Sequence, residues 1–419
     1  MLLRVPSFFN QFHCIAGKCT DTCCVGWEID VDERTLAKYK GLAELNGSAG
    51  KSCCKTKDNP EENCSRQKAF IKTLLENIED GHFILKPGDR CPFLKEDGLC
   101  DMICNLGCNG TDLDDKGESV LCDICREHPR FVEVYGDVME KGLGLCCEEA
   151  VRLLLTSNSH PEDNSHHRRH PELREGSSTE QGNATLTFIE SEIDDEPDEM
   201  PDGVEEARDA IFEEREAIFA ILNDRDTPLN QRLIEILDFA LAMSDCDKSE
   251  NSNDSENLSE QAIYQTWIEI LGEGESFGPA WDAAYERMVR KGWQQPQPLF
   301  TDEDGARIVA YLIFRYYAKS LFDGDNLTKV QFAIYFWIIL ERFGKELAGF
   351  TADSGLRWDN EADLLTAKIN AVKLLSKQTE YSEEIMEILT DNFFENPAFS
   401  VEQFRRILSQ ASSSTSMSP

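Results

Sequence analysis

Cysteine is the residue type through which this sequence could do chemistry. The chain has 16 Cys among 419 residues, and 15 of them lie at or before Cys147. Three fall in "CTDTCCVGW", which runs from Cys19 to Trp27. Thiolates bind soft metals and carry redox chemistry, while a buried thiol also packs as a small apolar group. The cysteines therefore mark an N-terminal unit, and their spacing bears on its chemistry.

Short motifs bring these thiols close together along the chain. They are C-x4-C-x3-C-C (Cys14, Cys19, Cys23, Cys24), "CPFLKEDGLC" (Cys91, Cys100), "CDIC" (Cys122, Cys125) and "LCCEEAVRLLL" (Cys146, Cys147). A structural zinc uses four ligands, so the motifs supply more thiols than one zinc needs. Spacing alone leaves zinc, copper(I), an iron–sulfur cluster, a second metal and spectator thiols open. A disulfide scaffold is disfavoured, because adjacent cysteines cannot bridge without strain and no export signal is visible.

A further motif suggests radical chemistry but does not fit it. Cys100, Cys104 and Cys108 form C-x3-C-x3-C, whereas the radical S-adenosylmethionine loop is usually C-x3-C-x2-C. The second gap is one residue too long, and no strand–helix repeat follows. The pattern therefore argues against a radical enzyme.

Four segments, taken in order, resemble the flagellin lysine N-methylase family. They are "FHCIAGKCTDTCCVGWEIDVD" (residues 12–32), "CPFLKEDGLC" (91–100), "LCDICREHPR" (121–130) and "CEEAVRLLL" (147–155). The arginine-bearing stretch over residues 213–237 is a weaker likeness. The same segments are also similar to zinc- or iron-chelating cysteine-rich domains.

The resemblance implies a protein-lysine N-methyltransferase that moves methyl groups from S-adenosylmethionine to flagellin. It also implies a cysteine-bound [4Fe-4S] cluster, with zinc as the alternative metal. By position it implies eight metal ligands: Cys14, Cys19, Cys23, Cys24, Cys91, Cys100, Cys125 and Cys147. It assigns no catalytic or donor-binding residue. The alternative is a non-catalytic, metal-chelating binding protein.

The sequence departs from the family pattern at several positions. Glu148 follows Cys147 where the family has proline, and His128 stands where tyrosine is usual. Several thiols fall outside the pattern, namely Cys53, Cys54, Cys64, Cys104 and Cys108. These extra thiols leave the number of metal centres open.

Charge and hydropathy limit the partners. The chain carries 79 acidic against 42 basic residues, a net charge of −37, which disfavours nucleic acid and anionic membranes. Its longest apolar run, residues 330–340, is too short for the about 20 residues that cross a bilayer, and predicts a buried helix. No signal peptide is visible, so we expect a cytoplasmic protein with reduced thiols. The acidic charge is compatible with flagellin or another lysine-bearing protein as partner.

The predicted fold class is mainly α: an N-terminal cysteine-rich metal-binding domain, then an all-helical region with disordered acidic linkers. Polar tracts contain few apolar residues and separate the segments. We expect a cysteine domain over 1–156, a disordered acidic linker over 157–203, a helical hairpin over 204–244, a polar linker over 245–260, a helical domain over 261–408 and a disordered tail over 409–419. The four histidines of the linker, at positions 160, 166, 167 and 170, are expected to be solvated.

Two further patterns bear on the mechanism. "LGEGESFG" (271–278) contains G-x-G-x3-G but follows a helical pattern rather than a strand, so we predict a turn and no nucleotide loop. No histidine follows His170. A catalytic base from the helical region would therefore be Asp, Glu or Tyr.

Overall fold

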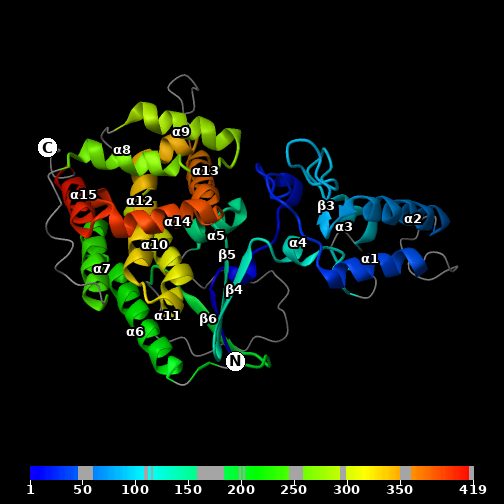
Figure 1. The fold of residues 1–419 in the computed structure, drawn as a ribbon, viewed down its shortest axis with the longest axis horizontal. Coiled ribbons are helices and arrows are strands. Elements are labelled where there is room, and N and C mark those ends of the chain that lie inside the picture. Colours follow the sequence, from blue (N-terminus) through cyan, green and yellow to red (C-terminus); the bar gives the residue numbers. More distant parts are fainter. Residues whose placement is uncertain are drawn as a thin grey trace. The chain divides into compact units, whose positions relative to one another are not determined.

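The computed structural model (Figure 1) describes residues 1–45, 60–107, 112–114, 117–157, 184–197, 200–201, 203–244, 258–292, 299–349 and 360–414. Within these residues the chain is mainly helical, as the sequence predicts. It divides into two compact units. The cysteine-rich unit is His13–Phe131, and the helical unit combines Met1–Phe12 with Val132–Pro419.

This division differs from the boundary expected near residue 156. The first strand, β1 (Leu2–Pro6), pairs in parallel with β5 (Val138–Leu143), and Leu3 lies opposite Met139. The cysteine-rich unit is therefore an insertion between two strands of one sheet. The N-terminal residues and the segment after Phe131 belong to the helical unit, because their pairing and packing partners are there.

A four-stranded sheet in the order β4-β5-β1-β6 is part of the helical unit. The remaining strands are β4 (Arg130–Tyr135) and β6 (Phe188–Glu192), and β6 runs antiparallel to β1. β6 lies inside the stretch predicted as a disordered linker, so that prediction is corrected for these residues. The Phe188 ring lies 5.0 Å from Phe314 and 5.7 Å from Phe219, which gives this short strand an apolar anchor.

Helices make up the rest of the helical unit. They are α5 (Glu148–Thr156), α6 (Val204–Asn223), α7 (Leu229–Met243), α8 (Glu260–Leu271), α9 (Pro279–Lys291), α10 (Asp302–Tyr316), α11 (Ser320–Asp323), α12 (Leu327–Leu347), α13 (Glu361–Glu380), α14 (Glu383–Glu395) and α15 (Val401–Ser414). The apolar run at 330–340 lies in α12, which is buried on all sides and packs against α7, α9, α10, α13 and α14. The glycine motif at 271–278 forms the turn between α8 and α9, as predicted. α15 continues into the predicted disordered tail, as far as Ser414.

A buried ion pair links the sheet to α6. Arg215 is fully buried, and its guanidinium donates to both carboxylate oxygens of Glu140 at 2.5 and 2.8 Å. It also donates to the carbonyl of Phe314 at 3.3 Å and lies over the Phe212 ring. The arginine-bearing stretch noted in the sequence thus contributes a charge to the interior of this unit.

The cysteine-rich unit is built from short elements around a small core. They are α1 (Glu33–Leu45), α2 (Pro60–Glu76), β2 (Ile78–Glu79), β3 (His82–Phe83), α3 (Asp101–Leu106) and α4 (Asp123–Glu127). Phe93 packs edge-on against Phe70 and Phe83 at the centre of this core. Long loops carry the cysteine motifs between these elements.

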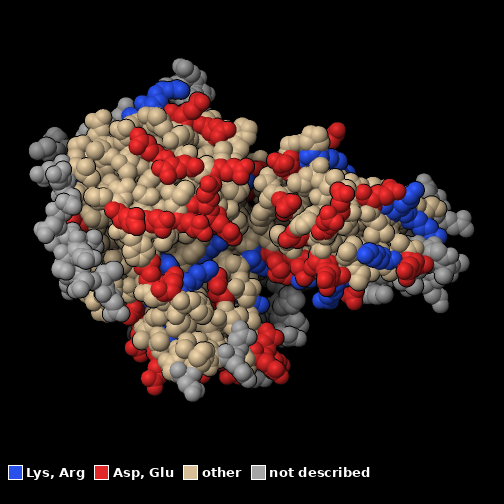
Figure 2. Space-filling view, viewed as in Figure 1, with Lys and Arg blue, Asp and Glu red and all other residues tan. Residues whose placement is uncertain are grey.

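Two features of the molecule as a whole bear on its partners. None of the helices in the described ranges is both long and apolar enough to cross a membrane. Acidic side chains are spread across the face seen in Figure 2, and basic side chains form smaller groups between them.

Candidate functional site

The predicted metal ligands fall in both units. Seven of the eight lie in the cysteine-rich unit, between Cys14 and Cys125, whereas Cys147 belongs to the helical unit. Cysteines 53, 54, 108 and 246 and the four linker histidines lie outside the described residues. The thiols that can be compared with one another are therefore those of the cysteine-rich unit.

Cys24 and Cys91 are held together by backbone pairing. The Cys91 amide donates to the Cys24 carbonyl at 2.9 Å, and Val25 and Arg90 form the adjacent antiparallel bridge. Cys91 is buried, and Cys24 packs on the same core. Two motifs more than 60 residues apart in sequence are thus joined at their cysteines.

Cys100, Cys122 and Cys125 reach the same core from two short helices. Cys100 immediately precedes α3, and Cys122 immediately precedes α4, which carries Cys125. Cys122 is fully buried, and its thiol is hydrogen-bonded to that of Cys125. Cys122 is absent from the ligands implied by the resemblance, although "CDIC" signals it in the sequence. Five thiols lie in or against this one core, and we call them the inner thiols: Cys24, Cys91, Cys100, Cys122 and Cys125.

The inner thiols differ in the direction in which their pKa is shifted. The hydrogen bond with the Cys23 thiol lowers the pKa of Cys24 to about 6, against the effect of burial, and Thr22 and Arg90 lower it further. Burial raises the pKa of Cys91 to about 12 and that of Cys100 to about 11. A thiolate at Cys24 beside neutral thiols is the arrangement in which one charge is tolerated in a small apolar core.

The Cys122–Cys125 pair behaves in the same way. Their mutual hydrogen bond lowers the pKa of Cys122 and raises that of Cys125, and the nearby Cys24 and Cys91 raise the pKa of Cys125 further. These thiols are therefore close enough to influence one another's charge. A cation placed among them would favour several thiolates at once, because it would offset the repulsion between them.

The remaining predicted ligands are at the rim of this unit. Cys14 and Cys23 are exposed and Cys19 is half-buried. The Cys14 sulfur accepts from the Ala16 amide at 3.4 Å, and the Cys19 thiol donates to the Asp21 carbonyl at 2.9 Å. The structure does not place these rim thiols among the inner ones, although Cys23 contacts Cys24 through its thiol.

The loop that carries Cys14 and Cys19 packs closely on the loop between Cys91 and Cys100. A Cβ at Gly17 would lie 2.7 Å from the Asp97 carbonyl oxygen, and a Cβ at Gly98 would lie 3.0 Å from the Gly17 Cα. Gly98 also has a φ of +77°, which favours glycine. The two glycines therefore allow the rim loop and the inner loop to touch.

The inner thiols fit a soft metal or an iron–sulfur cluster by their chemistry. Soft thiolates select zinc, copper(I) and iron–sulfur centres, and five of them border one core. Within the described part of the chain, no three Cys, His, Asp or Glu side chains are arranged so that they could hold a metal ion. The thiols that could bind a metal are present, and metal binding would require their side chains to close around it.

Cys147 has a different setting. It caps the N-terminal end of α5 through its backbone, and its neighbour Cys146 is buried and hydrogen-bonded to Tyr381. Burial raises the pKa of Cys146 to about 12. Cys146 therefore fits a neutral packing role, and the role of Cys147 as a ligand remains a prediction.

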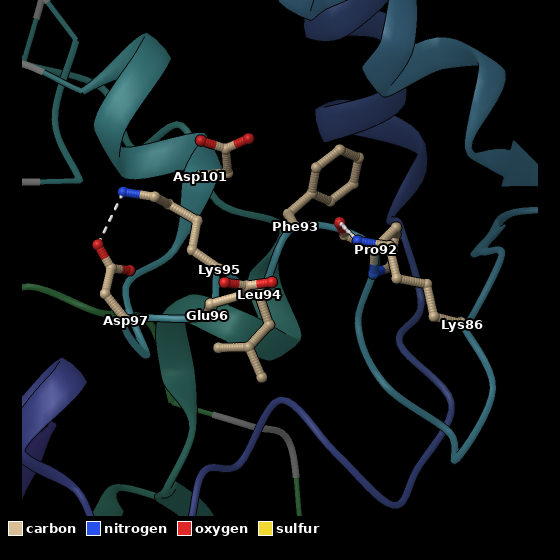
Figure 3. Close-up of a pocket in the computed structure, with 8 residues that line it drawn as sticks. All are labelled: Lys86, Pro92, Phe93, Leu94, Lys95, Glu96, Asp97 and Asp101. Carbon is tan, nitrogen blue, oxygen red and sulfur yellow. Dashed lines mark hydrogen bonds and ion pairs between the residues drawn. The ribbon is translucent and has the colours of Figure 1, made fainter.

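A pocket of about 520 Å³ follows the loop after Cys91 (Figure 3). Lys86 and Lys95 supply positive charge to its lining, and Phe93 and Leu94 supply an apolar wall. Glu96, Asp97 and Asp101 supply negative charge. Lys95 pairs with Asp97 at 3.0 Å, and Lys86 donates to the Pro92 carbonyl at 2.6 Å. A small molecule with an amino group, a carboxylate and an apolar part would match this lining.

Comparison with known proteins identifies relatives over part of the chain. Over 151 residues, 36% of the chain, it is 27% identical to the flagellar biosynthetic protein FliU of Salmonella muenchen, and the match covers 75% of that protein. Over 151 residues it is 28% identical to the lysine-N-methylases of Salmonella typhimurium and Salmonella choleraesuis. The match covers 31% of each methylase. No family model and no solved structure matches the chain. The resemblance drawn from the cysteine motifs is thus confirmed.

Proposed function

We propose that this chain, which is similar to two lysine-N-methylases, is itself a protein-lysine N-methyltransferase. We take S-adenosylmethionine as the methyl donor and flagellin, or another lysine-bearing protein, as the acceptor. The observation that carries the proposal is the 151-residue match to the two methylases and to a flagellar protein. The gathering of the inner thiols supports a metal centre in the cysteine-rich unit.

In this proposal the inner thiols hold the cluster together with rim thiols drawn from the predicted set. A bound [4Fe-4S] cluster would supply either a cross-link for the unit or an iron position for the donor's amino and carboxylate groups. Zinc is the alternative metal. In either case, metal binding would stabilise the unit, because it would tie together thiols that come from loops and short helices.

The transfer itself is an in-line displacement. The lysine nitrogen bonds to the methyl carbon as the carbon–sulfur bond breaks, and the product ammonium then loses a proton. The attacking amine must be neutral although free lysine has a pKa of about 10.4, so the site has to desolvate it or supply a base. Since no histidine follows His170, we expect that base to be Asp, Glu or Tyr if the helical unit provides it.

For the case in which the cluster only cross-links the unit, we assign the donor's amino-acid end to the pocket beside Cys91, because the lining combines both charges with an apolar wall. Lys95→Met should weaken S-adenosylmethionine binding by roughly tenfold, since it removes one charge-assisted contact. Lys72→Met is the matched control, because Lys72 is exposed on α2 and pairs only with Glu76 among the ion pairs found. Calorimetry on both variants decides; equal affinities would remove the donor from this pocket.

Mass spectrometry of a flagellin tests the activity. The anaerobically purified protein, incubated with isotope-labelled S-adenosylmethionine and flagellin, should add labelled methyl groups to surface lysines. High salt should slow the reaction if the net charge of −37 steers the encounter with a lysine-rich surface. No added methyl with metal present, over several flagellins, would contradict the proposal.

One observation favours a second function. The match covers 75% of FliU, whose name describes flagellar biosynthesis, but 31% of each methylase. A metal-chelating binding protein without transfer activity would agree with that coverage. Binding of metal without binding of S-adenosylmethionine would support this second reading.

A further inference from the structure

One face of α1 contacts the segment that carries Cys122 and Cys125. The Asp32 carboxylate accepts from the Thr35 amide at 2.8 Å and, through its other oxygen, from the Asp123 amide at 2.9 Å. Asp123 is the first residue of α4, and the Cys122 side chain makes no capping hydrogen bond there. Asp32 thus caps two helices at once, its own and that of the cysteine pair.

Two residues within α1 bind the same segment just ahead of Cys122. The Tyr39 hydroxyl donates to the Val120 carbonyl at 2.8 Å, and the Tyr39 side chain is fully buried. The Lys38 ammonium donates to the Ser119 carbonyl at 2.8 Å and pairs with Asp114 at 3.0 Å. Residues 119–123 are therefore fixed at three points by Asp32, Lys38 and Tyr39, which we call the α1 clamp.

We propose that the α1 clamp consists of positioning residues that set the place and orientation of Cys122 and Cys125 for metal binding. The inference rests on the proposed metal centre for its purpose, but its geometry stands on the three contacts alone. Removing residues that hydrogen-bond to metal ligands and orient them typically lowers metal affinity by roughly 10–100-fold. The clamp adds residues with no sulfur to the candidate site.

The substitution Asp32→Ser isolates the link between the two helices. Serine remains a good N-cap for α1 but is too short to reach the Asp123 amide as well. Asp325→Ser is a matched control, because Asp325 accepts from the Thr328 amide at the start of α12 in the helical unit. Both variants lose a carboxylate near a helix start, and only the first loses contact with the cysteine pair.

Two measurements on the full-length protein test the clamp. In protein stripped of metal, alkylation of Cys122 and Cys125 mapped by mass spectrometry should be severalfold faster in Asp32→Ser, with Cys91 as the internal reference. In protein reconstituted with iron and sulfide, chelator-driven iron release should be roughly tenfold faster. Asp325→Ser should match the wild type in both.

Tyr39→Phe gives an independent variant should Asp32→Ser fold poorly, since it removes only the hydroxyl that binds Val120. Unchanged alkylation of Cys122 and Cys125 in folded variants would overturn the clamp, whatever the activity. A wild type that binds neither iron nor sulfide would overturn the iron–sulfur proposal, while the alkylation result would still decide the clamp.

Discussion

At the scale of single residues, the strongest feature is the convergence of thiols from separate motifs. Cys24 and Cys91 meet through a backbone hydrogen bond, and Cys122 and Cys125 through their side chains. Cys104 is exposed, and its sulfur lies 4.0 Å from the Lys95 ammonium. The inner thiols and Cys104 therefore differ in setting although all lie in one unit.

We predict that Cys24→Ser and Cys125→Ser each lose most bound iron and sulfide, because a harder hydroxyl replaces a thiolate. The cysteine-rich unit should melt at a lower temperature as a result. Cys104→Ser and Cys246→Ser should keep the metal content of the wild type. Iron and sulfide analysis with differential scanning calorimetry checks this, and similar losses in all four variants would mean that the ligand assignment is wrong.

The sequence could predict part of this site. Motif spacing indicated which segments would gather, and the resemblance indicated eight ligands by position. The resemblance did not indicate Cys122, because the place of this thiol in the core depends on how α4 packs. The sequence also could not show that Cys147 belongs to the helical unit, because that depends on the pairing of β1 with β5.

A second residue-scale prediction concerns the buried Arg215–Glu140 pair. Glu140→Gln leaves the guanidinium buried without its counter-charge, and should lower the free energy of unfolding by about 3–5 kcal/mol. The double variant Glu140→Leu/Arg215→Met should be close to the wild type, because both charges are removed together. Arg4, 3.9 Å from Glu140, keeps Glu190 and Glu216 as partners in that variant. Denaturant unfolding of the three proteins decides; a double variant as unstable as the single one would contradict it.

At the scale of elements, helices were easier to predict than strands. The region expected as a helical hairpin over 204–244 contains α6 and α7. β6 was missed because its five residues, "FIESE", sit in an acidic tract. Its formation depends on β1, about 180 residues earlier in the chain, and no local pattern reports such pairing.

β6 gives a prediction at this scale. Phe188→Ala should cost about 2 kcal/mol of stability, below the about 3–5 kcal/mol of a fully buried phenylalanine, because Phe188 is half-buried. Replacing residues 158–183 with a Gly–Ser linker of equal length should leave thermal unfolding nearly unchanged. Extending that replacement through residue 197 should lower the melting temperature, since it removes β6. Equal melting of both linker variants would show that β6 contributes nothing.

At the scale of the whole molecule, the cysteine-rich unit is an insertion. The chain makes β1, leaves for His13–Phe131, and returns through β4 and β5 to the same sheet. Contacts on the helical side reinforce this return: the Tyr311 hydroxyl bonds both the amide and the carbonyl of Leu143, and Arg307 donates to the Leu155 carbonyl at 2.7 Å. The segment from Val132 to residue 156 is therefore part of the helical unit, and Leu143 and Leu155 are buried in it.

Fragments designed on either boundary should behave differently. A fragment of residues 157–419 lacks β1, β4, β5 and α5 and leaves Tyr311 and Arg307 without their partners Leu143 and Leu155. It should not fold cooperatively. Residues 1–12 joined by a Gly–Ser linker to 132–419 keep the sheet and should melt as one transition. Residues 13–131 alone should bind metal through the inner thiols without Cys147, and should not transfer methyl groups. Calorimetry and metal analysis of the three fragments check this. A folded 157–419 fragment would restore the boundary near residue 156. A 13–131 fragment that binds metal only when residues 132–156 are added would do the same and would make Cys147 an essential ligand.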